Sequence, residues 1–223
     1  MPEQSLSPTL EHAREVLITG SKILEVVLSS DQVDRYLSYL ALLSQWNDTF
    51  NLTSISDPVA VVRLHFLDSL AITPFLDKSG PLLDIGSGAG FPGMPLKIIF
   101  PSMAITLVEP RRKRANFLRA LIRHLQIKDV NIIEGRVEDL TPKLAGSFST
   151  VTLRAVGNLE FLLPLIRPLL QPGGKCLVMH GPKGNSYFSS LSALVPKHGF
   201  SKIKLHEYVL PLGSESRTVL ILS

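Results

Sequence analysis

The stretch from Asp84 to Gly93 reads Asp-Ile-Gly-Ser-Gly-Ala-Gly-Phe-Pro-Gly and directly follows a short apolar run, 81–83. Glycine adopts backbone conformations that other residues avoid, and it lets a ligand approach the main chain without meeting a Cβ atom. Closely spaced glycines at the end of a strand therefore predict a loop on which a nucleotide-like molecule rests. Gly88, Gly90 and Gly93 also match the dinucleotide pattern, and many glycine loops are plain turns, so the loop alone leaves the ligand open.

Two acidic residues near this loop help to choose the ligand. The next apolar run, 104–108, ends in Glu109, where a carboxylate can accept hydrogen bonds from both hydroxyls of a ribose. Asp84 precedes the first glycine, Gly86, and its charge would repel a pyrophosphate but suits a positively charged ligand. S-adenosylmethionine carries a sulfonium and an amino group, so it is the predicted cofactor, and NAD is the alternative.

Apolar runs alternate with helical patterns from residue 81 onward, which predicts an α/β fold with a mostly parallel, Rossmann-like, seven-stranded sheet. The expected strands lie near 81–85, 104–109, 130–134, 149–153, 175–179, 202–209 and 217–222. The last two have no helix between them and should pair as an antiparallel hairpin, which is the methyltransferase variant of the doubly wound sheet. After the third strand, Val137 and Glu138 stand where an adenine could lie, although Glu138 is equally explained as an acid at a helix N-terminus.

The chain is helical in pattern up to about residue 76. Ser29 or Ser30 can cap one helix, and Asp57 followed by Pro58 marks the start of another. The expected buried stripes are Val33, Leu37, Leu40, Ala41, Ser44, Trp46 and Phe50 in the first helix, and Val59, Val62, Phe66 and Leu70 in the second. We therefore expect an N-terminal helical segment over 1–76 and a cofactor-binding methyltransferase domain over 77–223.

Composition limits the class of protein. A hydrophobic fraction of 45% over 223 residues supports a substantial core. The single cysteine, Cys176, excludes an intrachain disulfide and a multi-cysteine metal site, and its apolar surroundings predict burial. The start of the chain lacks the features of a signal peptide, and no uninterrupted apolar run approaches the roughly 18 residues of a membrane span. We expect a cytoplasmic protein without membrane association and without a bound metal.

Several motifs add a more specific indication. The glycine loop continues into Phe91-Pro-Gly-Met-Pro95, which is more specific than the general methyltransferase pattern. The other motifs are Trp46-Asn47, Asn51-Leu52-Thr53, His65-Phe-Leu-Asp-Ser-Leu70, Arg154-Ala155 and Gly173-Gly174. With these motifs, nearly everything after residue 30 resembles the bacterial glucose-inhibited division protein B family, that is, ribosomal RNA small subunit methyltransferase G. One departure is the loop His180-Gly-Pro-Lys-Gly184, where family members commonly have Lys-Gly directly after the fifth strand.

The resemblance implies that a methyl group is transferred from S-adenosylmethionine to N7 of a guanine in 16S rRNA. The family's cofactor contacts fall on Gly86, Phe91, Val137, Glu138 and Arg154, and the loop analysis adds Asp84, Gly88 and Glu109. Arg154 follows the fourth expected strand and should stand at the carboxyl edge of the sheet, where open α/β sheets bind ligands. Its guanidinium could hold the cofactor carboxylate or an RNA phosphate through paired hydrogen bonds.

No catalytic acid, base or nucleophile is predicted. The sequence after the fourth strand, 154–158, reads Arg-Ala-Val-Gly-Asn and lacks both the Asn-Pro-Pro-Tyr-like motif of amino-directed methyltransferases and a thiolate nucleophile. Guanine N7 presents a lone pair and carries no proton, so positioning and exclusion of water would supply most of the catalysis. The lack of such catalytic residues would be equally compatible with many other methyl acceptors. Phe91 and Tyr187 are candidates for stacking on the target base.

Charge is distributed unevenly in this chain, whose formal net charge is +4. A basic run, 111–114, opens the helix after Glu109, and Arg112, Arg119 and Arg123 should share one exposed face that contacts RNA phosphates. The opposite, buried side is expected to consist of Ala115, Leu118, Leu121, Ile122 and Leu125. The predicted partner is 16S rRNA or the small ribosomal subunit, bound by a monomer. Methylation of a small molecule or a protein, and a non-catalytic role in binding RNA during ribosome assembly, stay open as alternatives.

His65 and Asp68 lie three residues apart on one helical face. They could pair with each other or with Asn47 and Asn51 in a polar network that locks the N-terminal helices onto the sheet. Contact with RNA or a place at the cofactor mouth is the other interpretation, and the structural one is preferred.

Overall fold

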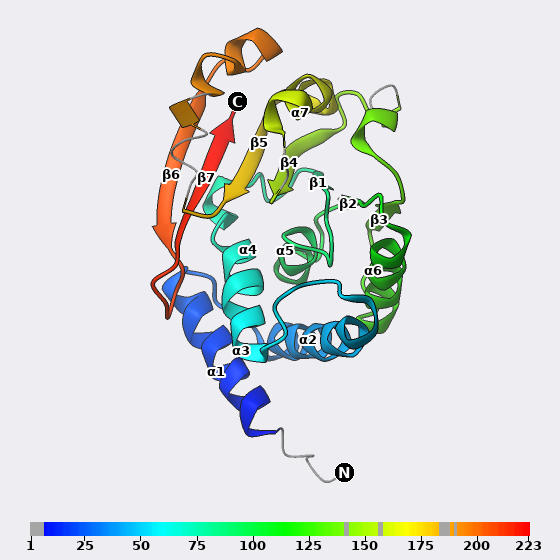
Figure 1. Cartoon of the computed structure of the whole chain (residues 1–223), viewed down its shortest axis with the longest axis vertical. Helices are drawn as coiled ribbons and strands as arrows, with labels where there is room; N and C mark the ends of the chain where they lie inside the picture. Colours follow the sequence, from blue (N-terminus) through cyan, green and yellow to red (C-terminus); the bar gives the residue numbers. More distant parts are fainter. Residues whose placement is uncertain (1–6, 141–142, 156–157, 183–187, 190) are drawn as a thin grey trace.

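A computed structural model of the chain describes residues 7–140, 143–155, 158–182, 188–189 and 191–223. Within these residues, seven strands form one sheet in the order β3-β2-β1-β4-β5-β7-β6 (Figure 1). Strands β1 to β5 run parallel, and β7 is antiparallel to both of its neighbours, β5 and β6. The strands are β1 (Leu82–Ile85), β2 (Ile105–Val108), β3 (Val130–Ile133), β4 (Phe148–Arg154), β5 (Leu170–His180), β6 (Ile203–Val209) and β7 (Ser216–Leu222).

The predicted strands and the C-terminal hairpin are confirmed. The largest difference is in β5, which begins at Leu170 rather than near residue 175. Phe148 of β4 pairs with Leu170, whereas Thr150 pairs with Lys175, so β5 carries extra residues between the two pairs. Gly173 lies in this irregular stretch with φ +77°, a conformation that favours glycine. The Gly173-Gly174 motif thus accommodates a bulge that an apolar pattern does not reveal.

The helical elements before the sheet are α1 (Pro8–Ile23), α2 (Ser30–Phe50), α3 (Pro58–Val61), the π-helical turn η1 (Val62–Leu67), α4 (Asp68–Leu70) and η2 (Thr73–Phe75). Those that follow β1 are α5 (Gly93–Ile99), α6 (Arg112–His124), η3 (Val137–Asp139), α7 (Leu159–Ile166), η4 (Arg167–Leu169) and η5 (Val195–His198). Both predicted helix starts are found. Ser29 caps α2 in a capping box with Gln32, and Asp57, which directly precedes Pro58, caps α3 by accepting the N–H of Ala60.

The buried face of α2 differs from the predicted one. Ala41, Ser44 and Phe50 are exposed, and the stripe instead includes Tyr36 and Tyr39, both fully buried. Buried tyrosines are tolerated when their hydroxyls find acceptors. Here the hydroxyl of Tyr36 donates to the carbonyl of Pro95 at 2.8 Å, and that of Tyr39 donates to the carbonyl of Ala89. A purely apolar count misses such residues. In the second helix Val62, Phe66 and Leu70 are buried as predicted, and Val59 only partly.

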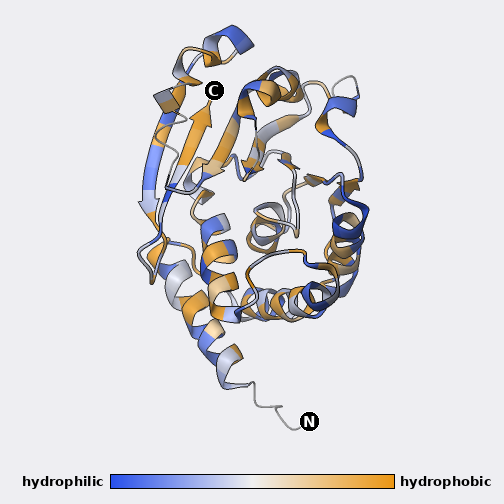
Figure 2. Ribbon diagram, viewed as in Figure 1, coloured by the Kyte–Doolittle hydropathy of each residue, from blue (hydrophilic) through white to orange (hydrophobic). Residues whose placement is uncertain are grey.

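Hydrophobic residues form one cluster on each face of the sheet. The first cluster joins α1, α2, η1, α5 and α6 to the strands, and the second joins α7, η4 and η5 to the opposite face (Figures 1 and 2). The N-terminal helices therefore share a core with the sheet, while the division at residue 76 stays a prediction. Cys176 is fully buried, and burial raises the pKa of its thiol.

One helical stretch, Pro58–Phe75, is long and apolar enough to cross a membrane by length and composition alone. It contains Arg63, His65 and Asp68, and 56% of it is buried within the molecule. These properties are those of a core helix, so the stretch is weak support for a membrane span.

Candidate functional site

The glycine loop connects β1 to α5 at the carboxyl edge of the sheet. Its first glycine, Gly86, has φ +72°, and its N–H donates to the carbonyl of Val108 at 2.8 Å, which holds the loop against the end of β2. Gly93 is required for packing rather than for conformation, since a Cβ there would lie 2.5 Å from Cδ2 of Leu107 and 2.9 Å from Oδ2 of Asp84. The loop is thus held tightly against both strands beneath it.

Asp84 lies underneath this loop and is fully buried. Its Oδ2 accepts the N–H of Gly93 at 3.1 Å, and its Oδ1 accepts the hydroxyl of Thr152 at 2.9 Å. Burial raises the pKa of the Asp84 carboxyl to about 6. The expected contact between Asp84 and a positively charged ligand does not fit this position. The side chain instead shapes the loop from below, where the sequence could not place it.

Glu109 directly follows β2 and is also buried, with 2% of its surface exposed. Its Oε2 accepts the N–H of Gly88 at 2.9 Å, and its Oε1 accepts the N–H of Arg111 at 2.8 Å. Each carboxylate oxygen has a second lone pair, so a ribose hydroxyl could still be accepted. Glu109 and Gly88 are therefore joined to each other, and their contact with the cofactor stays a prediction.

A cleft of about 590 Å³ opens at the carboxyl ends of β1 and β2. Its volume falls in the usual range for small-molecule sites, and open α/β sheets bind ligands at this edge. Three of the predicted cofactor residues meet here: Gly86, Val137 and Glu138. The full lining is Ile85, Gly86, Val108, Pro110, Arg111, Gly135, Arg136, Val137, Glu138, Asn158, Phe161 and Leu162.

Sequence reasoning did not single out the wall of the cleft that belongs to α7. The side chain of Asn158 caps this helix by accepting the N–H of Phe161 at 3.2 Å. Phe161 is 54% exposed and faces the cleft together with Leu162. An asparagine before an apolar helix just after the fourth strand is a visible signal for this wall. The cleft thereby offers apolar surface for a flat aromatic ring beside charged groups.

Phe91 takes a different position from the other predicted cofactor residues. Its ring is 6% exposed and stacks between Tyr39, 5.5 Å away, and His65, 4.5 Å away. An enclosed ring cannot stack on a target base in this conformation, so the suggested base-stacking role of Phe91 does not fit. A cofactor contact at this residue would have to use its main chain. Tyr187, the other stacking candidate, lies outside the described residues, as do Lys183 and Gly184.

Arg154 ends β4 at the carboxyl edge, as predicted. Its Nη2 donates to the carbonyl of Leu64 at 2.6 Å, and it lies 2.9 Å from Nδ1 of His65 and 3.2 Å from Oδ2 of Asp68. The guanidinium also lies 5.6 Å from the centre of the Phe91 ring. Arg154 thus connects the sheet edge to η1 and α4.

His65 and Asp68 are not paired directly with each other. Both side chains instead contact the guanidinium of Arg154. Burial, reinforced by the Arg154 charge, lowers the pKa of His65 to about 3, so the ring is neutral at pH 7. The Nδ1 atom of His65 lies 2.9 Å from Nη2 of Arg154 and 3.0 Å from the carbonyl oxygen of Leu64, and its Nε2 atom lies 3.0 Å from Oγ1 of Thr53. Asp68 accepts the hydroxyl of Tyr208 at 2.9 Å. The network supports the structural interpretation.

The network continues at both of its ends. The N–H of Thr53 donates to Oδ1 of Asn47 at 2.9 Å, whereas Asn51 ends α2 in a left-handed conformation. On the other side, Nε of Arg217 in β7 lies 3.6 Å from Oδ1 of Asp68. A hollow of about 250 Å³ lies beside it, lined by Asp68, Arg154, Ala155, Met179, His180, Gly181 and Arg217.

The basic face of α6 is exposed at Arg112, Arg119 and Arg123, as predicted. Arg119 already has partners: Oδ1 of Asn116 at 2.8 Å and Oε2 of Glu134 at 2.9 Å. The opposite side of the helix is buried at Ala115, Leu118, Leu121 and Leu125 and partly at Ile122, and Phe117 adds a fully buried ring that was not predicted. The contact of this face with RNA stays a prediction.

Solved methyltransferase structures share this fold. A SAM-dependent methyltransferase from Aquifex aeolicus aligns with a TM-score of 0.57 and 14% identity over 73% of this chain and 92% of that chain. TYW2 from M. jannaschii in complex with AdoMet aligns with a TM-score of 0.53 and 14% identity over 65% of this chain and 68% of that chain. At such identities the likeness establishes the fold alone.

Sequence comparison identifies the family. Ribosomal RNA small subunit methyltransferase G from Acetivibrio thermocellus is 34% identical over 213 residues, which cover 94% of this chain and 87% of the relative. The protein of the same name from Leptothrix cholodnii is 39% identical over 185 residues, 81% of this chain and 84% of the relative. A family model described as rRNA small subunit methyltransferase G matches residues 32–212. The chain belongs to the rRNA small subunit methyltransferase G family.

Proposed function

We propose that this protein transfers a methyl group from S-adenosylmethionine to N7 of a guanine in the 16S rRNA of the small ribosomal subunit. Its family and its sheet are those of methyltransferases, which confirms S-adenosylmethionine over NAD as the cofactor. The observation that carries the proposal is the cleft between the glycine loop and η3, because it assembles Gly86, Val137 and Glu138 at the carboxyl edge of the sheet. The guanine N7 acceptor follows from the family resemblance.

The residues of the cleft fit this cofactor. Ile85, Val108 and Val137 offer apolar surface for an adenine ring, and the exposed carboxylate of Glu138 can read its polar edge. Gly88, in the loop after β1, and Glu109, directly after β2, lie at the carboxyl ends of these strands, where the ribose would reach. Arg154 would face the carboxylate of the methionine part. When bound, S-adenosylmethionine supplies a methyl group on a positively charged sulfur.

The chain's own contribution to the reaction is positioning. Guanine N7 needs no base, since it bears no proton. What the site must do is align the acceptor and keep water out, which effectively lowers the entropic cost of bringing two reactants together. The buried hydrogen bonds under the loop and around Arg154 hold these groups in place. We assign no catalytic acid, base, nucleophile or metal.

The remaining assignments are part of the same proposal. Arg112, Arg119 and Arg123 would contact RNA phosphates, because all three are exposed along one face of α6. The protein would act as a monomer in the cytoplasm, which agrees with a single, fully buried cysteine. The RNA contacts, the monomeric state and the location do not depend on which atom of the RNA accepts the methyl group.

The decisive experiment combines unmodified small ribosomal subunits with methyl-labelled S-adenosylmethionine and the protein. Borohydride and aniline then cleave RNA at 7-methylguanine, and primer extension locates the break. One enzyme-dependent break in 16S rRNA is the expected result, and the Gly86→Asp variant is the matched inactive control. Label in RNA without a break would exclude N7. Label in a small molecule or protein, or no transfer despite binding to the subunit, would favour the two alternative functions.

A further inference from the structure

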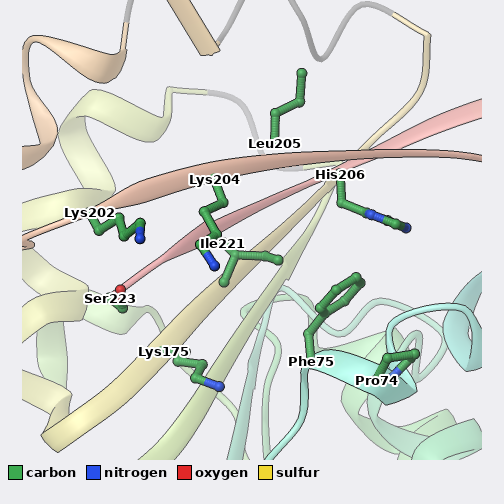
Figure 3. A pocket seen from close by; sticks show the side chains of 9 residues that line it. All are labelled: Pro74, Phe75, Lys175, Lys202, Lys204, Leu205, His206, Ile221 and Ser223. Atoms are coloured by element: carbon green, nitrogen blue, oxygen red, sulfur yellow. The ribbon is translucent and has the colours of Figure 1, made fainter.

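A second hollow lies at the opposite edge of the sheet from the cofactor cleft. It has a volume of about 420 Å³ and is formed by the middle of β5, the start of β6 and the end of β7, together with η2. Figure 3 shows Lys202, just before β6, and Lys204 of β6 extending toward the same side as Lys175 of β5, with Ile221 between Lys204 and Lys175. Pro74 and Phe75 form the wall, and His206 lies against Phe75 with their ring centres 4.9 Å apart.

The strand register explains why the three lysines converge. Cys176 and Ile203 both pair with Leu222, so the residues that precede them, Lys175 and Lys202, flank Ser223. The N–H of Lys202 donates to the carbonyl of Ser223 at 2.9 Å, and the N–H of Ser223 donates to the carbonyl of Lys202 at 3.0 Å. Because side chains alternate along a strand, Lys204 points to the same face as Lys202. The small Ser223 between two long side chains leaves the hollow open.

This cluster of positive charge is poorly compensated. All three lysines and His206 are exposed, and within the described ranges neither Lys202 nor Lys204 forms an ion pair. Asp77 interacts electrostatically with Lys175. Hydrogen bonds from Ser79 lower the pKa of Asp77, and the positive charge of Lys175 lowers it further. Lys175 and Lys202 stand on the two sides of β7, so their charges flank Ser223 from both neighbouring strands. The hollow therefore has the charge of an anion site.

We infer that Lys175, Lys202 and Lys204 form a second RNA contact, which we term the lysine groove, and that it binds backbone phosphates of the rRNA substrate. The inference rests on the proposed function, because rRNA is the polyanion that this function supplies. Lysine ammonium groups on flexible stems suit phosphates and read no sequence, so the groove would add affinity and orientation rather than choice of base. A substrate as large as the ribosomal subunit can contact both edges of so small a protein.

A competing explanation is that the lysines protect an edge strand. β6 is the last strand of the sheet, and charged side chains on such strands prevent pairing between molecules. Figure 2 shows that β6 is largely hydrophilic whereas the neighbouring β7 is hydrophobic. Protection of an edge works with either sign of charge, but phosphate binding needs positive charge. Reversal of the charge therefore separates the two explanations.

The test compares two triple variants with the same change in net charge. The groove variant carries Lys175→Glu, Lys202→Glu and Lys204→Glu. The control carries Lys22→Glu, Lys128→Glu and Lys143→Glu, at lysines that are exposed elsewhere. For both, we would measure binding to 16S rRNA transcript and unmodified subunits from 50 to 200 mM salt, calorimetric affinity for S-adenosylmethionine, and KM and kcat for methylation.

The expected result is that the groove variant stays monodisperse, keeps its cofactor affinity and binds RNA at least tenfold more weakly than the control. Its salt dependence should flatten by about one unit of slope per lost phosphate contact. Its KM for the subunit should rise with kcat unchanged. Equal RNA binding by the two variants would overturn the inference. It would also be overturned if inorganic phosphate bound to the lysine groove of the wild type without weakening its binding to RNA. If wild type itself transfers no methyl group to RNA, the proposed function fails, and the binding comparison still decides whether the groove contacts RNA.

A milder set of variants guards against misfolding. Lys202→Gln and Lys204→Gln each remove one charge from exposed positions and should each weaken RNA binding a few-fold with no change in thermal midpoint. Aggregation of these glutamine variants, combined with normal RNA binding by the glutamate variant, would establish edge protection instead and refute the phosphate contact.

Discussion

The main-chain N–H of Gly88 donates a hydrogen bond of 2.9 Å to Oε2 of Glu109, which ties the loop after β1 to the end of β2. The other oxygen of Glu109 accepts the N–H of Arg111 at 2.8 Å. A carboxylate can accept both bonds because it has no donor of its own. Glu109, the residue proposed to bind the ribose, therefore also holds the loop after β1 against the segment that follows β2.

Glu109→Gln should impair both roles. The amide has one acceptor oxygen, so its NH₂ group must face one of the two N–H donors, and one buried donor loses its partner. We expect a loss of about 1–3 kcal/mol in the free energy of unfolding. We also expect at least tenfold weaker binding of S-adenosylmethionine. Calorimetry and urea denaturation measure the two effects.

The matched control for this variant is Glu138→Gln. Glu138 is exposed in the cleft, so its substitution should weaken cofactor binding while the unfolding free energy stays constant. An equal loss of stability in the two variants would contradict the dual role of Glu109.

Gly86→Asp should abolish measurable cofactor binding. The backbone at Gly86 has φ +72°, and a carboxylate placed there would enter the cleft and strain the loop. Gly146→Asp is the matched control, since Gly146 also has a positive φ, +62°, but a Cβ there meets nothing within 4 Å and the residue lies outside the cleft. Calorimetric titration should show no heat for the first variant and unchanged affinity for the second. Retained affinity in Gly86→Asp would exclude Gly86 from the site.

The stability of the protein should depend on pH through Asp84. Burial raises the pKa of this carboxyl from 3.8 to about 6, so between these values the folded chain holds a proton that the unfolded chain has released. The folded state is therefore favoured at low pH, and its advantage from this group is lost as the pH rises through about 6. The difference corresponds to about 3 kcal/mol.

Asp84→Asn removes this titration and can keep both hydrogen bonds, with its oxygen toward Gly93 and its amide toward Thr152. As the pH rises from 4 to 7, the unfolding free energy of the wild type should fall relative to that of the Asp84→Asn variant. Urea denaturation at intervals of half a pH unit measures the difference. Parallel curves for the two proteins would show that Asp84 does not titrate in this range.

Much of the fold was predictable because its signals are local. Apolar runs separated by helical patterns located every strand of the described sheet, and Ser29 and Asp57 marked two helix starts. What failed depends on contacts between distant residues. Tyr36 and Tyr39 are buried because their hydroxyls reach the carbonyls of Pro95 and Ala89, and no pattern within α2 reveals those acceptors.

The site was predictable to a different degree. Gly86, Val137 and Glu138 meet in one cleft because the carboxyl ends of neighbouring parallel strands share an edge. Burial was not predictable in the same way. Asp84 and the ring of Phe91 stand at motif positions, yet both face the core, since their partners come from β4 and from the N-terminal helices.

Removal of arginines from α6 should weaken RNA binding unevenly. Arg112→Ala and Arg123→Ala should each reduce the salt slope of binding by about one unit, because both side chains are exposed and their charges face solvent. Arg119→Ala should have a smaller effect, since Arg119 already pairs with Glu134 at 2.9 Å. Filter binding to 16S rRNA at several salt concentrations measures these slopes. Equal slopes in all three variants and wild type would exclude this face as an RNA contact.

Arg154→Lys tests whether the polar network around Arg154 serves the cofactor or only the fold. One Nη2 atom contacts the carbonyl of Leu64, Nδ1 of His65 and Oδ2 of Asp68, and a lysine ammonium cannot reproduce the full planar set of guanidinium donors. We expect a loss of about 1–3 kcal/mol in unfolding free energy, because buried acceptors lose their partner. If Arg154 also faces the cofactor carboxylate, affinity for S-adenosylmethionine should fall at least tenfold.

Arg217→Lys supplies the comparison that makes this result interpretable. Arg217 approaches the same carboxylate of Asp68, but at 3.6 Å and from β7, so its substitution should cost less stability and leave cofactor affinity within twofold of wild type. Calorimetry with S-adenosylmethionine and with S-adenosylhomocysteine, which shares the carboxylate but lacks the sulfonium charge, would show parallel losses in Arg154→Lys. Because Arg154 would act on the carboxylate and not on the sulfur, a loss confined to S-adenosylmethionine would contradict its assignment. Lower stability with unchanged affinity for both compounds would make Arg154 a structural residue, held at the sheet edge to fasten the N-terminal helices.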